Sequence, residues 1–358
     1  MHGEPRPGGS PPGGLLGQVA EAAAIGRALD RARLVTVTGL PGVGKTAVGL
    51  AAADAAAGTF ADGSLLLRLD ALRDEALLPH TVGAALRLPD EFARSRLDVL
   101  TGQLRDRHLL LVLDTCEHLL GACAALVAAL LPHCPKIAVL ATSREPLRVP
   151  GEVTVAIRPL RLADAVELFV RQAARAGVEL EDRAAVASAC VQLDKLPLAI
   201  ELAAAQLVRP GQGRPDVARQ LAELTGRLAA GHDIPRGPGQ PGRHQTLRAA
   251  IGWSHELCTP SERLLWARLS VFAGPFGARD AQDVCASSEL PDESVAAGLS
   301  LLAERSVLLA DGGERFLLPV TLRGYGRYML RRLGQDEEFA ARHRCWQDRQ
   351  GQGAPTGG

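Results

Sequence analysis

The feature that most constrains the fold of this chain is a glycine-rich loop between a short apolar segment and an alanine-rich one. Residues 39–46 read GLPGVGKT, which matches the Walker A pattern in full. The preceding residues 34–38, LVTVT, predict a buried strand, and the residues after the loop are good helix formers. A strand, a glycine-rich turn and a helix in this order wrap backbone N–H groups around phosphates. The sequence therefore predicts an α/β P-loop domain that binds a nucleoside triphosphate or diphosphate.

Within this loop two side chains have distinct expected roles. Lys45 is expected to reach the β- and γ-phosphates, and the Thr46 hydroxyl is expected to bind Mg²⁺. Lysine is rare in this chain, with three among 358 residues, so its presence at this position supports the Walker A assignment. The phosphates are expected to lie against the rest of the loop and the start of its helix, at Gly39, Gly42, Val43, Gly44 and Ala47.

A second motif follows at residues 108–114, HLLLVLD, which predicts an apolar strand that ends in a carboxylate. Asp114 is expected to hold the metal from the side opposite Thr46, as in a Walker B motif. Many fast P-loop ATPases have a second carboxylate at the next position, but here it is Thr115, which does not accept a proton at neutral pH. Glu117 either orients water or caps the next helix, and capping is favoured. We therefore expect slow hydrolysis at best.

A third segment, residues 141–144 with the sequence ATSR, follows the fourth predicted strand. In a sheet of this kind the loop after that strand lies near the γ-phosphate, so Thr142 and Arg144 are candidate γ-phosphate sensors. The planar fork of donors on an arginine suits phosphate oxygens. A surface ion pair is the alternative for Arg144.

The pattern along the chain predicts three folded parts. A P-loop domain, a parallel sheet with flanking helices, is expected over 15–158, because apolar runs alternate with helical segments. Helical periodicity alone continues over 159–230. Residues 243–345 read as helices, a short hairpin near 306–318 and a final helix, which is typical of a winged-helix domain.

The strands and the unstructured segments can also be placed from the sequence. The predicted strands are residues 34–38, 64–69, 108–113, 137–141 and 153–157. Glycine- and proline-rich composition predicts a disordered linker at 1–14, a second linker at 231–242 and a disordered tail at 346–358.

Composition sets bounds without choosing a function. The net charge is zero, so no overall field draws the chain to nucleic acid or to an anionic membrane. The seven cysteines show no zinc-site spacing and are expected to be thiols in a reducing cytoplasm. The longest apolar run, 119–131, is too short to cross a bilayer, and residues 1–14 contain no apolar signal-peptide core. A cytoplasmic location without a membrane partner is the expectation.

Five motifs in one order carry a family resemblance. The Walker A loop is followed by LVLDTCEH, ATSREPLRVPGE, LPLAIELAA and RHQTLRAAI, and this order resembles a STAND-class P-loop NTPase. Specifically, it resembles the NB-ARC module of actinobacterial SARP and LuxR-type transcriptional regulators over about residues 15–345. The resemblance implies that ATP or ADP and Mg²⁺ are the cofactors. It also implies that a helical (ARC1-like) domain and a winged-helix domain close over ADP, and that the ATP form opens and self-associates.

The resemblance further implies site residues in the adenine pocket. Leu16 is expected there, next to Gln18, which replaces an arginine of the family. Pro197 is expected to contact the base. Lys195 stands where the family has a glycine, so a strained turn is expected at this position.

The function implied is a regulatory ATP/ADP switch that an effector reads. Such regulators also carry a DNA-binding effector and a helical-repeat sensor, so the chain is expected to be a fragment or a reduced standalone paralogue. Residues 317–321, LLPVT, lack the Glu or His-Asp pair of the family's winged-helix motif.

Two other functions compete with the switch. One is a turnover ATPase or small-molecule phosphotransferase, and the other is an initiator-type ATPase that binds DNA through its winged helix. The last predicted helix carries four arginines, but acids nearly balance bases from 243 to 349. We therefore do not expect the chain to bind DNA directly. The four arginines are Arg323, Arg327, Arg331 and Arg332.

Overall fold

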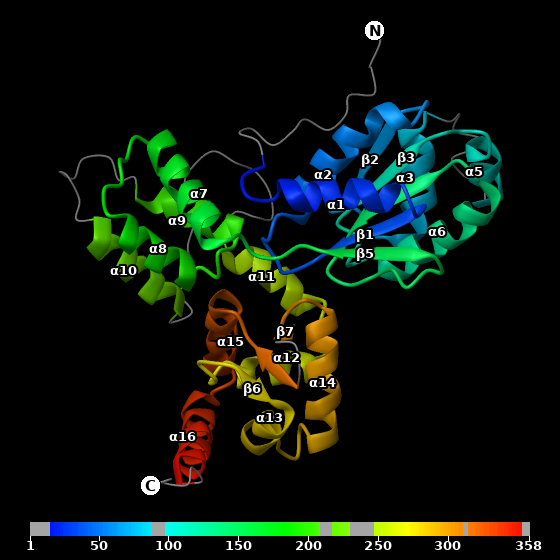
Figure 1. Cartoon of the computed structure of the whole chain (residues 1–358). Helices are drawn as coiled ribbons and strands as arrows, with labels where there is room; N and C mark the ends of the chain where they lie inside the picture. Colours follow the sequence, from blue (N-terminus) through cyan, green and yellow to red (C-terminus); the bar gives the residue numbers. More distant parts are fainter. Residues whose placement is uncertain (1–14, 88–96, 208–216, 230–246, 311–313, 353–358) are drawn as a thin grey trace, which may run out of the picture. The chain divides into compact units, whose positions relative to one another are not determined.

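The chain divides into two compact units, Met1–Arg158 and Pro159–Gly358. The computed structural model describes residues 15–87, 97–207, 217–229, 247–310 and 314–352, which Figure 1 shows as coloured ribbon. The linkers predicted at 1–14 and 231–242 lie outside these described residues.

The first unit contains a five-stranded sheet in which every pair of neighbours is parallel, in the order β2-β3-β4-β1-β5. This confirms the predicted parallel sheet with flanking helices, and each strand begins within two residues of its predicted start. The strands are β1 (Leu34–Thr38), β2 (Ser64–Arg68), β3 (Leu110–Asp114), β4 (Ala138–Thr142) and β5 (Glu152–Ala156).

Helices cover both faces of this sheet, as Figure 1 shows. On one face α1 and α2 contact each other and β1, and on the other α3, α5 and α6 enclose the core beneath β2 and β3. The central strands β1, β3 and β4 are buried along their whole length, which explains why they read as continuous apolar runs. Helix α1 was not predicted from the sequence. The helices are α1 (Val19–Leu29), α2 (Lys45–Ala56), α3 (Leu78–Ala85), α5 (Leu97–Leu104) and α6 (Leu120–His133).

The strand order fixes where the three sequence motifs lie. Since β3, β4 and β1 are adjacent and parallel, their carboxyl ends lie side by side at one edge of the sheet. Val37 of β1 pairs with Thr142 of β4, and Leu113 of β3 pairs with Ala141. The Walker A loop, Asp114 and the 141–144 segment therefore meet at this edge, which is where ligands bind in open α/β sheets.

The second unit is mostly helical. Within the described residues of this unit, four helices come first, and six more follow together with a small antiparallel sheet of order β6-β8-β7. The first four are α7 (Leu162–Arg175), α8 (Arg183–Gln192), α9 (Pro197–Gln206) and α10 (Val217–Ala229). The other helices are α11 (Leu247–Glu256), α12 (Pro260–Leu269), α13 (Ala278–Cys285), α14 (Asp292–Glu304), α15 (Val320–Arg332) and α16 (Asp336–Gln352). The strands are β6 (Phe276–Gly277), β7 (Leu309–Ala310) and β8 (Arg315–Leu317).

Helix α16 corrects the prediction of a disordered tail that starts at residue 346, because the helix continues to Gln352. Trp346 is the anchor. Its ring packs edge-on against Phe272 at 5.3 Å between centroids, and its indole N–H donates to Asp280 at 3.2 Å. These two contacts join the otherwise polar end of α16 to residues outside the helix. Residues 353–358 lie outside the described part of the chain.

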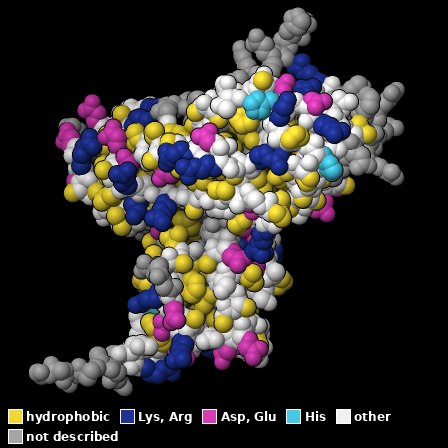
Figure 2. Space-filling view, turned by 45° about the vertical axis from the view of Figure 1, so that its right-hand side comes forward, with side chains coloured by type: hydrophobic (Ala, Val, Ile, Leu, Met, Phe, Trp, Pro, Cys, Tyr) yellow, Lys and Arg dark blue, Asp and Glu magenta, His cyan; other side chains and the backbone are white. Residues whose placement is uncertain are grey.

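The surface of the described residues carries mixed charge. On the face that Figure 2 shows, the basic and acidic side chains are interspersed over both ends of the view. Among the described helices, none is both long enough and apolar enough to cross a membrane.

Candidate functional site

The Walker A loop has a backbone that only glycine accommodates at two positions. Gly39 and Gly44 have φ values of 146° and 101°. A Cβ on Gly39 would lie 2.6 Å from the carbonyl oxygen of Ile157, and one on Gly44 would lie 2.9 Å from Oε1 of Gln18. The loop then enters α2, whose N-cap residue Gly44 supplies no capping side chain. The positive end of this helix is thus turned toward the space that the loop encloses.

Gln18 supports this loop from outside. Its side-chain amide is buried, and Nε2 donates a hydrogen bond of 2.8 Å to the carbonyl oxygen of Val43. From the sequence, Gln18 was identified only as a departure from the family's arginine, and this role was not predicted because nothing local links residue 18 to residue 43. Leu16, the expected adenine contact, lies half-buried in the segment just before α1.

Lys45 lies at the first position of α2 and reaches back over its own loop. Its ammonium donates to the carbonyl oxygens of Gly39 and Leu40 at 2.8 and 3.2 Å. Burial lowers the pKa of Lys45 to about 8, while the carboxylate of Glu117 opposes this shift. A phosphate at this position would supply the negative charge that a buried ammonium favours.

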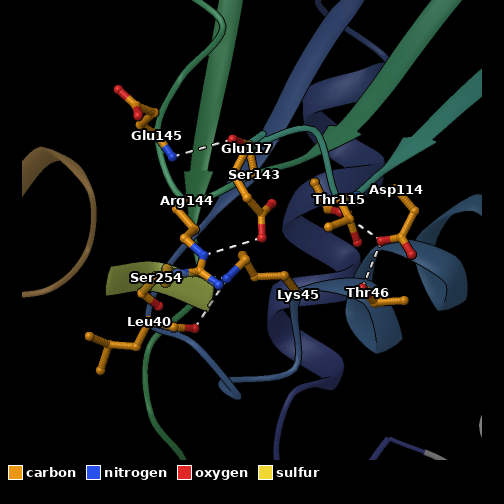
Figure 3. A network of polar contacts seen from close by, with 12 residues as sticks. Leu40, Lys45, Thr46, Asp114, Thr115, Glu117, Ser143, Arg144, Glu145 and Ser254 are labelled. Atoms are coloured by element: carbon orange, nitrogen blue, oxygen red, sulfur yellow. Dashed lines mark hydrogen bonds and ion pairs between the residues drawn. The ribbon is translucent and has the colours of Figure 1, made fainter. Parts of the chain in front are cut away.

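Thr46, Asp114 and Thr142 form one hydrogen-bonded group across three elements, which Figure 3 shows in part. Both hydroxyls donate to the same oxygen, Oδ1 of Asp114, each at 2.7 Å. The two predicted metal ligands, Thr46 and Asp114, are therefore brought into contact, and the second oxygen of the carboxylate accepts neither of these bonds. Thr142, a candidate sensor in the sequence analysis, positions the Asp114 carboxylate.

The loop after β3 is held against β4 by hydrogen bonds from its first two residues, Thr115 and Cys116, to Thr142. Thr115 has a φ of 70°, which is costly for a β-branched residue. Its N–H donates to the hydroxyl of Thr142 at 2.9 Å, and the N–H of Cys116 donates to the Thr142 carbonyl oxygen at 2.9 Å. Strained backbone of this kind persists where surrounding contacts over-determine it.

Glu117 and Arg144 form a buried ion pair, and this corrects two expectations. Glu117 Oε1 lies 3.2 Å from Arg144 Nε, and each side chain is only 8% exposed. Glu117 does not cap α6, because that helix begins after Leu119 without a side-chain cap. The ion pair of Arg144 is not on the surface. Figure 3 shows Arg144, Glu117 and Lys45 directed toward one another at the edge of the sheet.

Pro197 belongs to the second unit, where it is the first residue of α9. The two residues just before Leu196 have positive φ: Asp194 at 54° and Lys195 at 55°. This confirms the strained turn expected where Lys195 replaces a glycine. The carboxylate of Asp194, which the sequence analysis did not single out, accepts hydrogen bonds from the start of α15.

The first-unit residues fit a nucleotide with Mg²⁺. Two oxygen ligands, a buried lysine and a glycine-built cradle lie at one edge of the sheet, and oxygen donors are what Mg²⁺ prefers. Within the described ranges no cluster of three or more His, Cys, Asp or Glu side chains forms a metal site. A magnesium ion at Thr46 and Asp114 would thus take its other ligands from phosphate and water, as is usual for this ion.

Comparison with known proteins supports the fold and the general class. The chain is 41% identical over 326 residues to Rv0890c of Mycobacterium tuberculosis, a candidate HTH-type transcriptional regulator. The match covers 88% of this chain but only 36% of that protein. The chain thus spans about a third of the length of this regulator. It is also 36% identical over 345 residues to the uncharacterized protein Rv0894 of the same organism, covering 92% of this chain and 84% of Rv0894.

Among solved structures, the Walker-type ATPase PABY2304 of Pyrococcus abyssi superposes with a TM-score of 0.64 at 15% identity, over 90% of this chain and 99% of that one. This likeness shows a shared P-loop ATPase fold. No family model matches the chain.

Proposed function

Because the chain belongs to the same family as Rv0894 of Mycobacterium tuberculosis and has a P-loop ATPase fold, we propose that it is an ATP- and ADP-binding regulatory switch. Its output would be transcriptional, as the name of its relative Rv0890c suggests for that protein. The observation that carries the proposal is the shared oxygen of Asp114, which accepts from Thr46 and Thr142 at 2.7 Å each, together with Thr115 at the position directly after Asp114 where fast ATPases have a second carboxylate.

Each residue of this group has a defined task in the proposed switch. The backbone of residues 39–44 and the start of α2 bind the phosphates, and Lys45 neutralises them. Thr46 and Asp114 hold Mg²⁺, which shields the phosphate charge when it is bound. Thr142 keeps the Asp114 carboxylate oriented. Thr115 provides no base for an attacking water, so the bound triphosphate persists for longer than in a fast ATPase.

The second unit is proposed to be the moving part of the switch. We assign 159–230 as the helical domain and 243–345 as the winged-helix domain of an NB-ARC module, with Pro197 as a contact to the base. The three-stranded sheet β6-β8-β7 after a set of helices supports the winged-helix assignment. Exchange of ADP for ATP would open the module and permit self-association, a population shift that an effector can read.

Direct DNA binding is not part of this proposal. Two of the arginines in α15 are engaged with the protein itself: Arg323 donates to the carbonyl oxygen of Ala273 and Arg327 to that of Ser270. The helix that precedes the β7-β8 hairpin, α14, begins with Asp292 and Glu293, which would repel phosphate backbone.

The test is the nucleotide content of the purified chain, measured by heat denaturation and chromatography, with Lys45→Ala alongside. Stoichiometric ADP that is lost in the variant is the expected result, because a switch retains its product. Steady phosphate release above about 1 s⁻¹ with added ATP would instead assign a turnover ATPase. A chain that retains and binds no nucleotide would refute both assignments.

A further inference from the structure

The buried pair of Glu117 and Arg144 places a negative charge inside a site that binds negatively charged ligands. Glu117 lies 3.2 Å from the Arg144 guanidinium, and both side chains are 8% exposed, so water screens this pair only weakly. The charge of Glu117 also raises the pKa of Lys45, against the larger opposite effect of burial. One carboxylate therefore faces the two cations nearest to the expected position of the terminal phosphate.

Neither role considered from the sequence explains this arrangement. Glu117 does not cap α6, and its Oε1 is already held by the Arg144 guanidinium instead of being directed to a water molecule. The charge of the site offers a different role. A diphosphate is expected to need the loop, Lys45 and the metal, whereas a γ-phosphate brings further negative charge toward Arg144 and Lys45. Glu117 would repel that added charge and compete for the same two cations.

We propose that Glu117 is a specificity-determining residue that favours ADP over ATP by occupying the Arg144 guanidinium. This inference rests on the proposed nucleotide switch and assigns its resting preference to one side chain. The γ-phosphate must displace the Glu117 carboxylate from Arg144 before the triphosphate is fully bound. The ion pair thus determines how much more tightly the closed form binds ADP than ATP.

The experiment compares the Kd values of ATP and ADP, each with Mg²⁺, for the full chain by titration calorimetry. In Glu117→Gln the shape is kept and the charge is lost. We expect the affinity for ATP to rise about tenfold relative to that for ADP, because one close like-charge interaction is removed. Glu117→Ala removes the same charge without a new amide and should shift the ratio in the same direction.

Glu145→Gln is the matched control. Glu145 is the next residue after Arg144, pairs with Arg148 at 4.0 Å, and points away from Lys45 in Figure 3. Loss of its charge should leave the ratio of the two Kd values unchanged.

Three results would overturn the inference, and they can be told apart. An unchanged ratio in both Glu117 variants refutes the role in selectivity while the switch itself stands. Loss of ATP hydrolysis with an unchanged ratio assigns Glu117 to water activation instead. If the wild-type chain binds neither nucleotide, the proposed function fails and this inference fails with it.

Discussion

The carboxylate of Asp194 caps a helix that begins 126 residues later in the chain, and its loss should weaken the second unit. Oδ1 accepts from the N–H of Val320 at 2.8 Å, and Oδ2 accepts from the N–H and the hydroxyl of Thr321 at 2.7 Å each. The N-cap residue of α15 is Pro319, which has no capping side chain. Asp194 therefore supplies from a distant turn the cap that the local sequence lacks.

The expected cost of Asp194→Ala follows from these contacts. Loss of an N-cap costs about 0.5–2 kcal/mol, and an unsatisfied N–H at Thr321, which is 1% exposed, adds about 1–3 kcal/mol. Burial raises the pKa of Asp194 although its hydrogen bonds to Thr321 and Val320 oppose the shift, so desolvation of the charge offsets part of the gain. We therefore expect a loss near the lower end, about 2 kcal/mol in the free energy of unfolding.

The assay is urea unfolding of the full chain followed by tryptophan fluorescence, with Asp182→Ala as the matched control. Asp182 caps only its own helix, α8, through the N–H groups of Ala184 and Ala185 at an exposed site. Its loss should cost about 1 kcal/mol or less. Asp194→Asn keeps one acceptor and tolerates the left-handed backbone, so it should fall between the wild-type chain and Asp194→Ala. If Asp194→Ala cost no more than Asp182→Ala, the long-range cap would not stabilise the unit.

Three further outcomes are expected. Thr142→Val should lower the free energy of unfolding by about 1–3 kcal/mol, since it leaves the Thr115 N–H without its acceptor. Thr36→Val is the control, because the buried Thr36 hydroxyl has no hydrogen-bond partner within the described residues, and its stability should rise or stay the same. Equal losses in both variants would contradict this reasoning. Gln18→Ala removes the bond to Val43, and we expect ATP and ADP to bind about threefold to tenfold more weakly by calorimetry, a ~1 kcal/mol effect. Unchanged affinity would show that the Walker A loop keeps its conformation without this bond. Burial lowers the pKa of His255 from 6.5 to about 4. The neutral ring is thus favoured in the fold, and its contribution is present above pH 6.5 and is lost as the pH falls toward 4, up to about 3 kcal/mol. Urea unfolding at pH 7 and pH 4.5 should show a smaller decline for His255→Asn than for the wild-type chain, and equal declines would refute this.

The sequence by itself determined the strands of the first unit and the identity of the central residues of its site. Walker A and the strand that ends at Asp114 are local patterns, because a buried parallel strand is an uninterrupted apolar run and a P-loop needs glycines at fixed positions. The parallel direction of the strands placed the ends of β1 and β3 at the same edge, and the strand order β3-β4-β1, which only the structure supplies, brought Lys45, Thr46 and Asp114 together there.

Only the tertiary structure decided the contacts between residues far apart in the chain. Gln18 against Val43, Glu117 against Arg144 and Asp194 against Thr321 each join segments whose own periodicity and composition carry no sign of the partner. The end of α16 likewise packs through a contact between Trp346 and Phe272, which lie far apart in the chain. A hydrogen bond or ion pair between distant segments depends on how separate elements pack together, and that packing is a property of the whole fold, which no short window of sequence contains.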